Sequence, residues 1–460
     1  MTRSLIALAT LTSAAAATAQ SPVPDRILLH YGDDPATSLT VTWRTDVGTK
    51  AAFGQIAVAT DGPGIRETRG KIAGTTKPVT VAPPPASDAD GRPSPSDVNY
   101  HEVAFTGLRP NTLYAYRIGN GKVWSEWFHA RTAAATAAGD VTPFRFVYVG
   151  DAQNDIKSLW SRVMRQAYGD APDAAFLLHA GDLVNRADSD AEWGEWFHGG
   201  GFVFGQTPSI AVPGNHEYTR RPANSPAEQA LQSAGIWQGT LSDRWDERFA
   251  FPFNGPDGLE ETAYYYDVNG VRVIGLNSMA ALQSAGLRGK QTVWLRQVLE
   301  DNPGRWTIVT HHHPIHSSSR GRDNLTLRES WQPVYDEFGV DLVLQGHDHS
   351  YGRSGLLTHE DHADHGHSHG VGENLTTGLS TQAGHGTVYV VSVSGPKQYP
   401  FKKYPEEENP FVARGEFLQL YQVIDVTHDA ITYEARTATG RLHDRFVLTK
   451  DETGHKRITQ

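Results

Sequence analysis

The chain contains no cysteine among its 460 residues. Disulfide bonds, thiolate-bound metals and cysteine nucleophiles are therefore excluded. Basic residues are fewer than acidic ones, and the net charge of −11 argues against a general affinity for nucleic acid or for an anionic membrane surface. Long apolar runs are also missing after the N-terminus, so no later segment is predicted to span a bilayer.

The first residues have the pattern of a secretory signal peptide. Arg3 precedes an apolar centre, and Ala17-Thr18-Ala19 is a small-x-small cleavage signal. We therefore expect residues 1–19 to be removed before Gln20, and the protein to be secreted or periplasmic. Export without cysteine favours a bacterial source. The alternative, a short buried helix, is disfavoured because Ala-Thr repeats pack poorly.

Short alternating segments at the start of the mature chain predict an all-β domain over residues 20–135. Pro-Asn and Gly-Asn-Gly turns separate these segments, which is typical of a β-sandwich with Trp43 in its core. Residues 81–97 are rich in Pro, Ser and Asp and predict a surface loop. Residues 136–143 are expected to form a linker.

Strands alternate with helices in the rest of the chain, which predicts a layered α/β domain over residues 144–450. Apolar strands are expected at 144–151, 174–182, 209–217, 305–314 and 341–350. Helical spacing is found at 155–167 and 292–300, and an Asn269-Gly270 turn predicts a hairpin over 264–278.

Five of these strands end in polar residues suited to metal binding. In order they are Gly150-Asp151, Gly181-Asp182, Gly214-Asn215-His216-Glu217, Val309-Thr310-His311-His312 and Gly346-His347-Asp348-His349. Functional groups of α/β sheets gather at the carboxyl ends of strands, so one site is expected to collect them. Asp, Asn and His together suit borderline divalent metals. They are too many for one tetrahedral ion, and two ions about 3.5–4 Å apart that share a carboxylate would use them all.

The ordered set of motifs resembles the binuclear metallophosphoesterase (calcineurin-like) superfamily. The N-terminal sandwich and the Tyr351-Gly352-Arg353-Ser354 run make the chain most similar to its purple acid phosphatase branch. The resemblance implies a metallophosphoesterase β-sandwich flanked by helices, behind an immunoglobulin or fibronectin-III-like domain.

The resemblance also implies the role of each motif residue. Asp182 would bridge two ions, Asp151 and His349 would complete the first site, and the second site would use Asn215, His312 and His347. His216 would bind the phosphate or protonate the leaving alkoxide. A metal-bound hydroxide would attack phosphorus, and the ions would be two of Zn, Mn or Fe.

Two positions depart from the family pattern. The purple enzymes have a tyrosine where this chain has Asn185, and that phenolate binds the first iron and gives the colour. Most other metallophosphoesterases have a His at the position of Gln153. Gln153 or Asn185 could each bind an ion through the amide oxygen. A neutral oxygen stabilises a trivalent ion less than a phenolate does, so we expect two divalent ions and a protein that is not purple.

The segment after His312 supplies candidate substrate contacts. His313, His316, Arg320 and Arg322 are available there, and an arginine can hold a phosphate through paired hydrogen bonds. On a strand, His311 and His313 would face away from His312, so supporting or surface roles are expected for them. Residues 359–370 are rich in His and Asp and form either a metal-scavenging segment or a solvated insertion.

Taken singly, the strand-end residues could be turn formers, helix caps or exposed histidines. Taken together, they predict a secreted binuclear phosphomonoesterase that acts on small phosphate esters. A phosphodiesterase is the alternative within catalysis. The alternative from another class is a sandwich-led adhesion or binding protein with an inactive metal centre.

Overall fold

A computed structural model describes residues 21–80, 97–319, 322–360, 381–404 and 409–460. The predicted signal peptide, nearly all of the predicted 81–97 loop and most of the His-rich segment lie outside these ranges. Within the described ranges no helix is both long enough and apolar enough to cross a bilayer.

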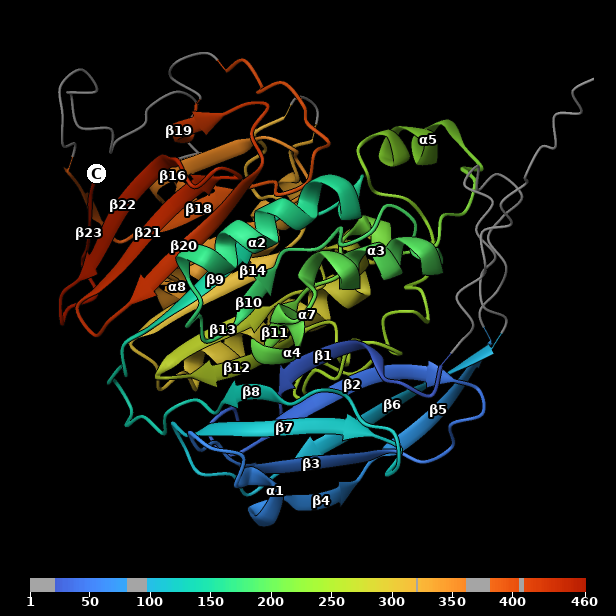
Figure 1. Cartoon of the computed structure of the whole chain (residues 1–460). Coiled ribbons are helices and arrows are strands. Elements are labelled where there is room, and N and C mark those ends of the chain that lie inside the picture. Colours follow the sequence, from blue (N-terminus) through green and yellow to red (C-terminus); the bar gives the residue numbers. More distant parts are fainter. Residues whose placement is uncertain (1–20, 81–96, 320–321, 361–380, 405–408) are drawn as a thin grey trace, which may run out of the picture.

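The N-terminal domain is a sandwich of two antiparallel four-stranded sheets (Figure 1). The first sheet has the order β1 (Asp25–Tyr31), β2 (Leu39–Asp46), β6 (Asp97–Phe105), β5 (Thr75–Thr80), and the second has the order β4 (Gly70–Ala73), β3 (Phe53–Val58), β7 (Leu113–Gly119), β8 (Phe128–Arg131). Buried and exposed residues alternate along β8 and at the end of β6, whereas β1 and β2 are buried along most of their length. Trp43 is buried between the sheets and stacks on His101.

The second domain contains two larger sheets. One has the order β11 (Ser209–Ala211), β10 (Leu177–His179), β9 (Phe144–Val149), β20 (Leu420–Val426), β21 (Ala430–Thr437), β22 (Leu442–Lys450), β23 (Lys456–Thr459), β17 (Thr381–Gly384). The other has the order β12 (Tyr264–Val268), β13 (Val271–Gly275), β14 (Trp306–His311), β15 (Leu342–Gln345), β18 (Thr387–Val391), β16 (Tyr351–Leu357), β19 (Phe411–Gly415).

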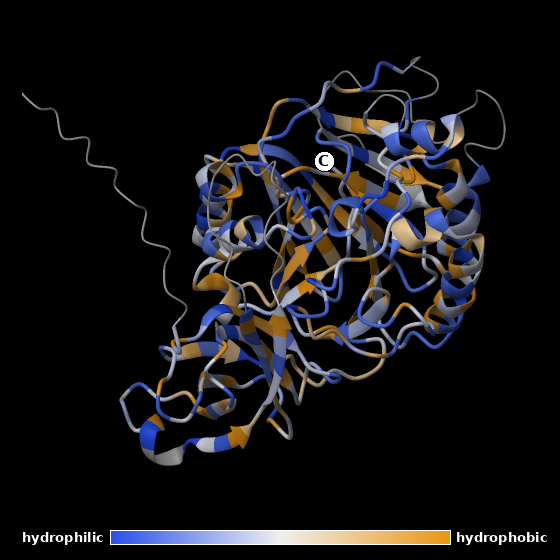
Figure 2. Ribbon diagram, turned by 90° about the vertical axis from the view of Figure 1, so that its right-hand side faces the viewer, coloured by the Kyte–Doolittle hydropathy of each residue, from blue (hydrophilic) through white to orange (hydrophobic). Residues whose placement is uncertain are grey.

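Helices cover the outer faces of both sheets. A π-helical turn (Ile156–Trp160) leads into α2 (Ser161–Asp170), which packs with α3 (Asp190–Gly200) beside the first sheet. The short α6 (Ser278–Gln283), α7 (Ala285–Glu300) and α8 (Leu325–Phe338) share a hydrophobic cluster with the second sheet. Figure 2 shows hydrophobic residues concentrated on the central strands. The predicted layered α/β domain behind an all-β domain is confirmed.

The two domains are joined by a continuous hydrophobic cluster rather than by a bare linker. The hydroxyl of Tyr31 in β1 donates to the carbonyl of Ala175 at 2.8 Å, and the hydroxyl of Tyr116 in β7 donates to the carbonyl of Gly205 at 2.6 Å. Gly205 lies in α4 (Val203–Gln206). The N-terminal sandwich therefore packs directly against the domain that contains the polar strand ends.

Candidate metal centre

The polar strand ends meet because both large sheets present parallel strands at the same place. Strands β9, β10 and β11 run parallel in the first sheet, and β13, β14, β15 and β18 run parallel in the second. An isolated parallel bridge pairs Asp151, which follows β9, with Val393, which follows β18. The carboxyl ends of the two sheets are thereby held against each other.

One group of donors gathers around His312. The Oδ1 atom of Asn215 lies 3.0 Å from the Nε2 atom of His312 and 3.0 Å from the Nδ1 atom of His347. These two ring nitrogens are 3.1 Å apart, and Oδ2 of Asp182 lies 3.2 Å from Nε2 of His312. Lone pairs that converge this closely repel one another unless a cation or a proton lies among them.

A second group contains Asp151, Asp182 and His349, all of them buried. The Nε2 atom of His349 lies 3.4 Å from Oδ2 of Asp151. This oxygen is buried and accepts no hydrogen bond from any described residue. The ligand atoms within each group lie within 4.8 Å of one another, and Asp182 belongs to both groups. The donor set fits two ions that share one carboxylate.

Main-chain carbonyls orient the histidine rings. Nδ1 of His312 donates to the carbonyl of Ala180 at 2.8 Å, and Nδ1 of His349 donates to the carbonyl of Lys397 at 2.9 Å. A carbonyl can only accept, so each ring carries its proton on Nδ1 and turns the Nε2 lone pair into the site. His347 has the opposite orientation, and its Nδ1 faces the other donors.

The strand-end glycines leave room for these side chains. A Cβ atom on Gly214 would lie 2.2 Å from Oδ1 of Asp182, and one on Gly346 would lie 2.4 Å from Oδ1 of Asp151. Asp182 and His347 themselves have positive φ angles of 52° and 77°. Such angles are costly for residues other than glycine and are found mainly where function requires them.

The charges of the site are coupled through Asp182. Burial opposes its ionisation, but His312 and His216 hold its pKa below the usual range of a carboxyl group. Burial likewise lowers the pKa of His312, but the carboxylates of Asp182 and Asp151 outweigh this and raise it to about 9. The carboxylates therefore create a strong preference for a positive charge among the donors.

His216 lies beside this group without joining it. Its Nε2 atom is 4.0 Å from Oδ2 of Asp182, and its Nδ1 atom donates to the carbonyl of Asn185 at 2.6 Å. The edge of the ring meets Trp237, with 5.1 Å between centroids. The ring is half-buried, so Nε2 is placed to meet a group that enters above Asp182.

The two candidate extra ligands take different positions. Gln153 is buried, and its Nε2 atom donates to Oδ2 of Asp182 at 2.8 Å, which places its amide beside the carboxylate that both groups share. Asn185 acts on the site through its main chain. Its carbonyl accepts the hydrogen bond from His216, and its N–H donates to Glu192.

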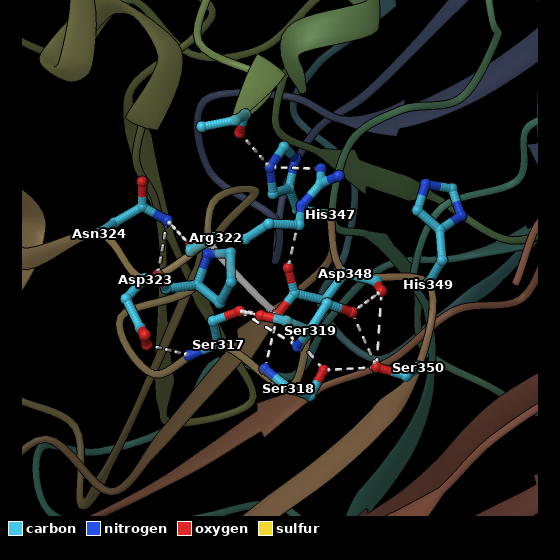
Figure 3. Close-up of polar contacts among 12 residues, drawn as sticks. Ser317, Ser318, Ser319, Arg322, Asp323, Asn324, His347, Asp348, His349 and Ser350 are labelled. Carbon is cyan, nitrogen blue, oxygen red and sulfur yellow. Dashed lines mark hydrogen bonds and ion pairs between the residues drawn. The ribbon is translucent and has the colours of Figure 1, made fainter. Parts of the chain in front are cut away.

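The predicted substrate segment packs around the ligands. Arg322 contacts Nε2 of His347, and its guanidinium forms an ion pair with Asp348 at 3.3 Å (Figure 3). His313 is buried beside the His347 ring and is hydrogen-bonded to Ser278. The alternative expectation that His313 lies on the surface is therefore wrong. His311 is also buried. His316 packs on Tyr389, with its Nε2 atom 3.5 Å from the amide nitrogen of Gln332, and Arg320 lies outside the described residues.

Sequence reasoning missed three residues that shape the site. Glu217 is buried, and its carboxylate accepts the main-chain N–H groups of Asp182, Leu183 and Gly214. Lys397 holds the His349 ring through its carbonyl, and Trp237 packs on His216. Glu217 is the last residue of the motif that contains His216, so its position in the motif could have indicated a role. Lys397 and Trp237 belong to no recognisable pattern.

Two family models match the chain over the parts that form these domains. Residues 144–351 match the calcineurin-like phosphoesterase family, and residues 24–132 match the purple acid phosphatase N-terminal domain. The chain therefore contains a calcineurin-like phosphoesterase domain behind a purple acid phosphatase N-terminal domain, as the motif set predicts.

The similar proteins agree with this assignment. Human acid phosphatase type 7 is 26% identical over 359 residues, which are 73% of this chain and 72% of that protein. Purple acid phosphatase 15 of Arabidopsis thaliana is 25% identical over 55% of this chain, and the match spans about half of its own length, 49%. The structure of a purple acid phosphatase from yellow lupin superposes with a TM-score of 0.72 at 19% identity, covering 94% of this chain and 75% of that one.

Proposed function

We propose that this metallophosphoesterase is a phosphomonoesterase that releases inorganic phosphate from small organic esters. One observation carries the proposal: two groups of donors share Asp182, and His216 stands beside them with a free Nε2 atom. Asp151 and His349 would hold the first ion, while Asn215, His312 and His347 would hold the second. When bound, such ions polarise the oxygens of a phosphate and lower the pKa of water.

The remaining chemistry belongs to the side chains. The Asn185 carbonyl fixes Nδ1–H of His216, so the second ring nitrogen is the one that can contact a phosphate oxygen. When the ring is protonated, Nε2–H can be given to the departing alkoxide. Asp182 lies 4.0 Å from this nitrogen and stabilises the charged ring.

The reaction class is tested by comparing p-nitrophenyl phosphate with bis(p-nitrophenyl) phosphate. The purified protein is loaded in turn with Mn, Zn, Fe and Co, and kcat/KM is measured for each ester. We expect the monoester to be preferred. Preference for the diester would instead assign a phosphodiesterase. Turnover of neither ester by protein that binds two ions per chain would favour the binding protein.

The metals proposed are two divalent ions. Asn185 stands where the purple enzymes have the tyrosine phenolate, and Gln153 turns its amide nitrogen toward the shared carboxylate of Asp182. A site without a phenolate stabilises a trivalent ion less. We expect elemental analysis to find divalent Zn, Mn or Fe at two ions per chain, and no charge-transfer band in the visible spectrum. Such a band would contradict the proposal.

We further propose that the protein works outside the cytoplasm, in the periplasm or medium of a bacterium. The support is the N-terminal signal pattern and the absence of cysteine. Expression of the full chain with its leader, followed by N-terminal sequencing of the exported protein, tests this. A mature chain that begins at Gln20 is expected, and a chain retained uncut in the cytoplasm would contradict it.

A further inference from the structure

Lys397 lies at the candidate metal centre although it belongs to none of the five motifs. It follows β18, and its carbonyl holds the His349 ring. Its Nζ atom lies 3.5 Å from Oε1 of Gln153, whose own Nε2 atom donates to the shared carboxylate of Asp182 at 2.8 Å. A single amide therefore separates the ammonium group from the carboxylate that both donor groups share.

The ammonium group of Lys397 has no carboxylate to neutralise it among the described residues. Its polar contact is with the neutral amide of Gln153. The side chain is half-buried, and the ring of Tyr399, which packs on His349, lies 5.8 Å from Nζ. A cation held in this way is available to an anion that enters the site.

Lys397 also lies near the residue proposed to contact the phosphate. Nε2 of His216 is 4.0 Å from Oδ2 of Asp182, and the same oxygen accepts the amide of Gln153 that meets Nζ of Lys397. Lys397 and His216 are therefore both linked to one carboxylate oxygen. A phosphate bound beside this oxygen would lie near both.

Arg322, one of the candidate substrate contacts in the sequence, already pairs with a carboxylate of the protein. Its guanidinium pairs with Asp348, which in turn accepts hydrogen bonds from Ser317 and Ser318 (Figure 3). Arg322 also meets His347 at Nε2, the ring nitrogen that points away from the donor group. The available positive charge therefore belongs to Lys397 rather than to Arg322.

We propose that the ammonium group of Lys397 binds the phosphate of the substrate and makes the site favour doubly charged monoesters over singly charged diesters. This inference rests on the proposed phosphoesterase function. An ammonium group forms stronger hydrogen bonds with a dianion than with a monoanion, so its contribution depends on the charge of the ester.

The test compares Lys397→Met, Lys397→Arg and the control Lys403→Met, which changes an exposed lysine of the same segment. Calorimetry measures the Kd of inorganic phosphate for each metal-loaded protein. A lost hydrogen bond to a charged group predicts a Kd roughly tenfold weaker or more for Lys397→Met. Lys397→Arg is expected to retain most of the affinity, and Lys403→Met is expected to match the wild type.

The kinetics give a second readout. In Lys397→Met we expect kcat/KM to fall roughly tenfold for p-nitrophenyl phosphate but only about two- to threefold for the bis ester. An unchanged phosphate Kd, or an equal loss for both esters, would overturn the inference. Failure of the wild type to bind phosphate or to hydrolyse either ester would instead overturn the proposed function.

Discussion

At the scale of single residues, Asp182 connects every part of the candidate site. Its carboxylate belongs to both donor groups, accepts the N–H of His216 at 2.8 Å and accepts the amide of Gln153. Removing it would leave each group short of a negative charge and would free the loop that carries His216.

We expect Asp182→Ala to lose both ions and all measurable phosphoesterase activity, because neither remaining group holds enough charge to bind a divalent ion tightly. Elemental analysis after dialysis checks the metal content. The control is Asp429→Ala, which changes an exposed carboxylate and should keep two ions per chain. Full metal content in Asp182→Ala would contradict the shared role.

The variant His216→Ala distinguishes a role in binding the ions from a role in the reaction. The ring is not among the donors, so the metal content should stay unchanged. The loss of a group that donates a proton or a hydrogen bond to the reacting phosphate typically lowers kcat about 10²–10⁴-fold. Steady-state kinetics at saturating metal measure this. A variant that retained the full kcat would remove His216 from the mechanism.

Some residues of the candidate site could be predicted from the sequence and others could not. The gathering of the six candidate metal ligands was predictable because each follows a strand end, and the two parallel sets bring strand ends together. Lys397 was not predictable, because a lysine in a Ser-Gly-Pro-Lys-Gln loop has no periodicity and its position depends on the bridge between Asp151 and Val393. The side of His347 that Arg322 contacts likewise depends on packing.

At the scale of elements, the short turns after β10 and β11 are held by one buried carboxylate. Glu217 accepts the N–H groups of Asp182 at 2.9 Å and of Gly214 at 2.7 Å with one oxygen, and that of Leu183 at 2.8 Å with the other. The chain ends of two neighbouring strands are therefore fixed relative to each other.

Glu217→Gln turns one acceptor into a donor that faces main-chain N–H groups. A buried group left unsatisfied costs about 1–3 kcal/mol, so the free energy of unfolding should fall by that amount. Urea unfolding followed by tryptophan fluorescence measures it. Glu337→Gln, which breaks an exposed pair with Arg296, should cost less than about 1 kcal/mol. Equal effects of the two substitutions would rule out the proposed role of Glu217.

At the scale of the whole molecule, a buried charge network joins the domains. Arg26 of β1 donates to both carboxylate oxygens of Asp190 in α3, at 2.6 and 2.7 Å. Arg44 of β2 lies 3.3 Å from the same carboxylate, and the buried Arg248 lies 3.5 Å from it. Three guanidinium groups from two domains thus meet at one aspartate, although Arg44 also pairs with Asp25 and Arg248 with Glu247.

Asp190→Ala would leave the buried guanidinium of Arg26 without its carboxylate. Breaking a buried pair by removing one partner costs about 3–5 kcal/mol. We expect a lower Tm in scanning calorimetry, and a sandwich that becomes sensitive to protease before the second domain does. The double variant Arg26→Met with Asp190→Leu should recover part of the loss. An unchanged Tm would show that the hydrophobic cluster alone joins the domains.

The same interface contains a pH-dependent group. His30 of β1 is buried between Phe249 and Phe251 of the second domain, and burial lowers its pKa to about 3. The unfolded chain takes up this proton near pH 6.5 and the folded chain does not, so stability is lost as the pH falls from 6.5 toward 3. The loss is about 1.4 kcal/mol per pH unit and about 4 kcal/mol by pH 3.

His30→Leu removes this proton uptake. The free energy of unfolding of the variant should therefore fall less steeply between pH 6 and 4 than that of the wild type, by about one proton in slope. Urea unfolding at a series of pH values measures both slopes. Parallel curves would mean that His30 does not titrate between the folded and unfolded chains.

The bridge between Asp151 and Val393 also bears on when metal can bind. Asp151 and His347 are 196 residues apart in the chain, and both belong to a site that needs the two sheets together. A nascent chain therefore cannot complete the candidate site until the segment that ends at Val393 has left the ribosome and paired with Asp151. The ions present where the chain completes its folding, rather than where translation begins, decide which metals the mature protein carries.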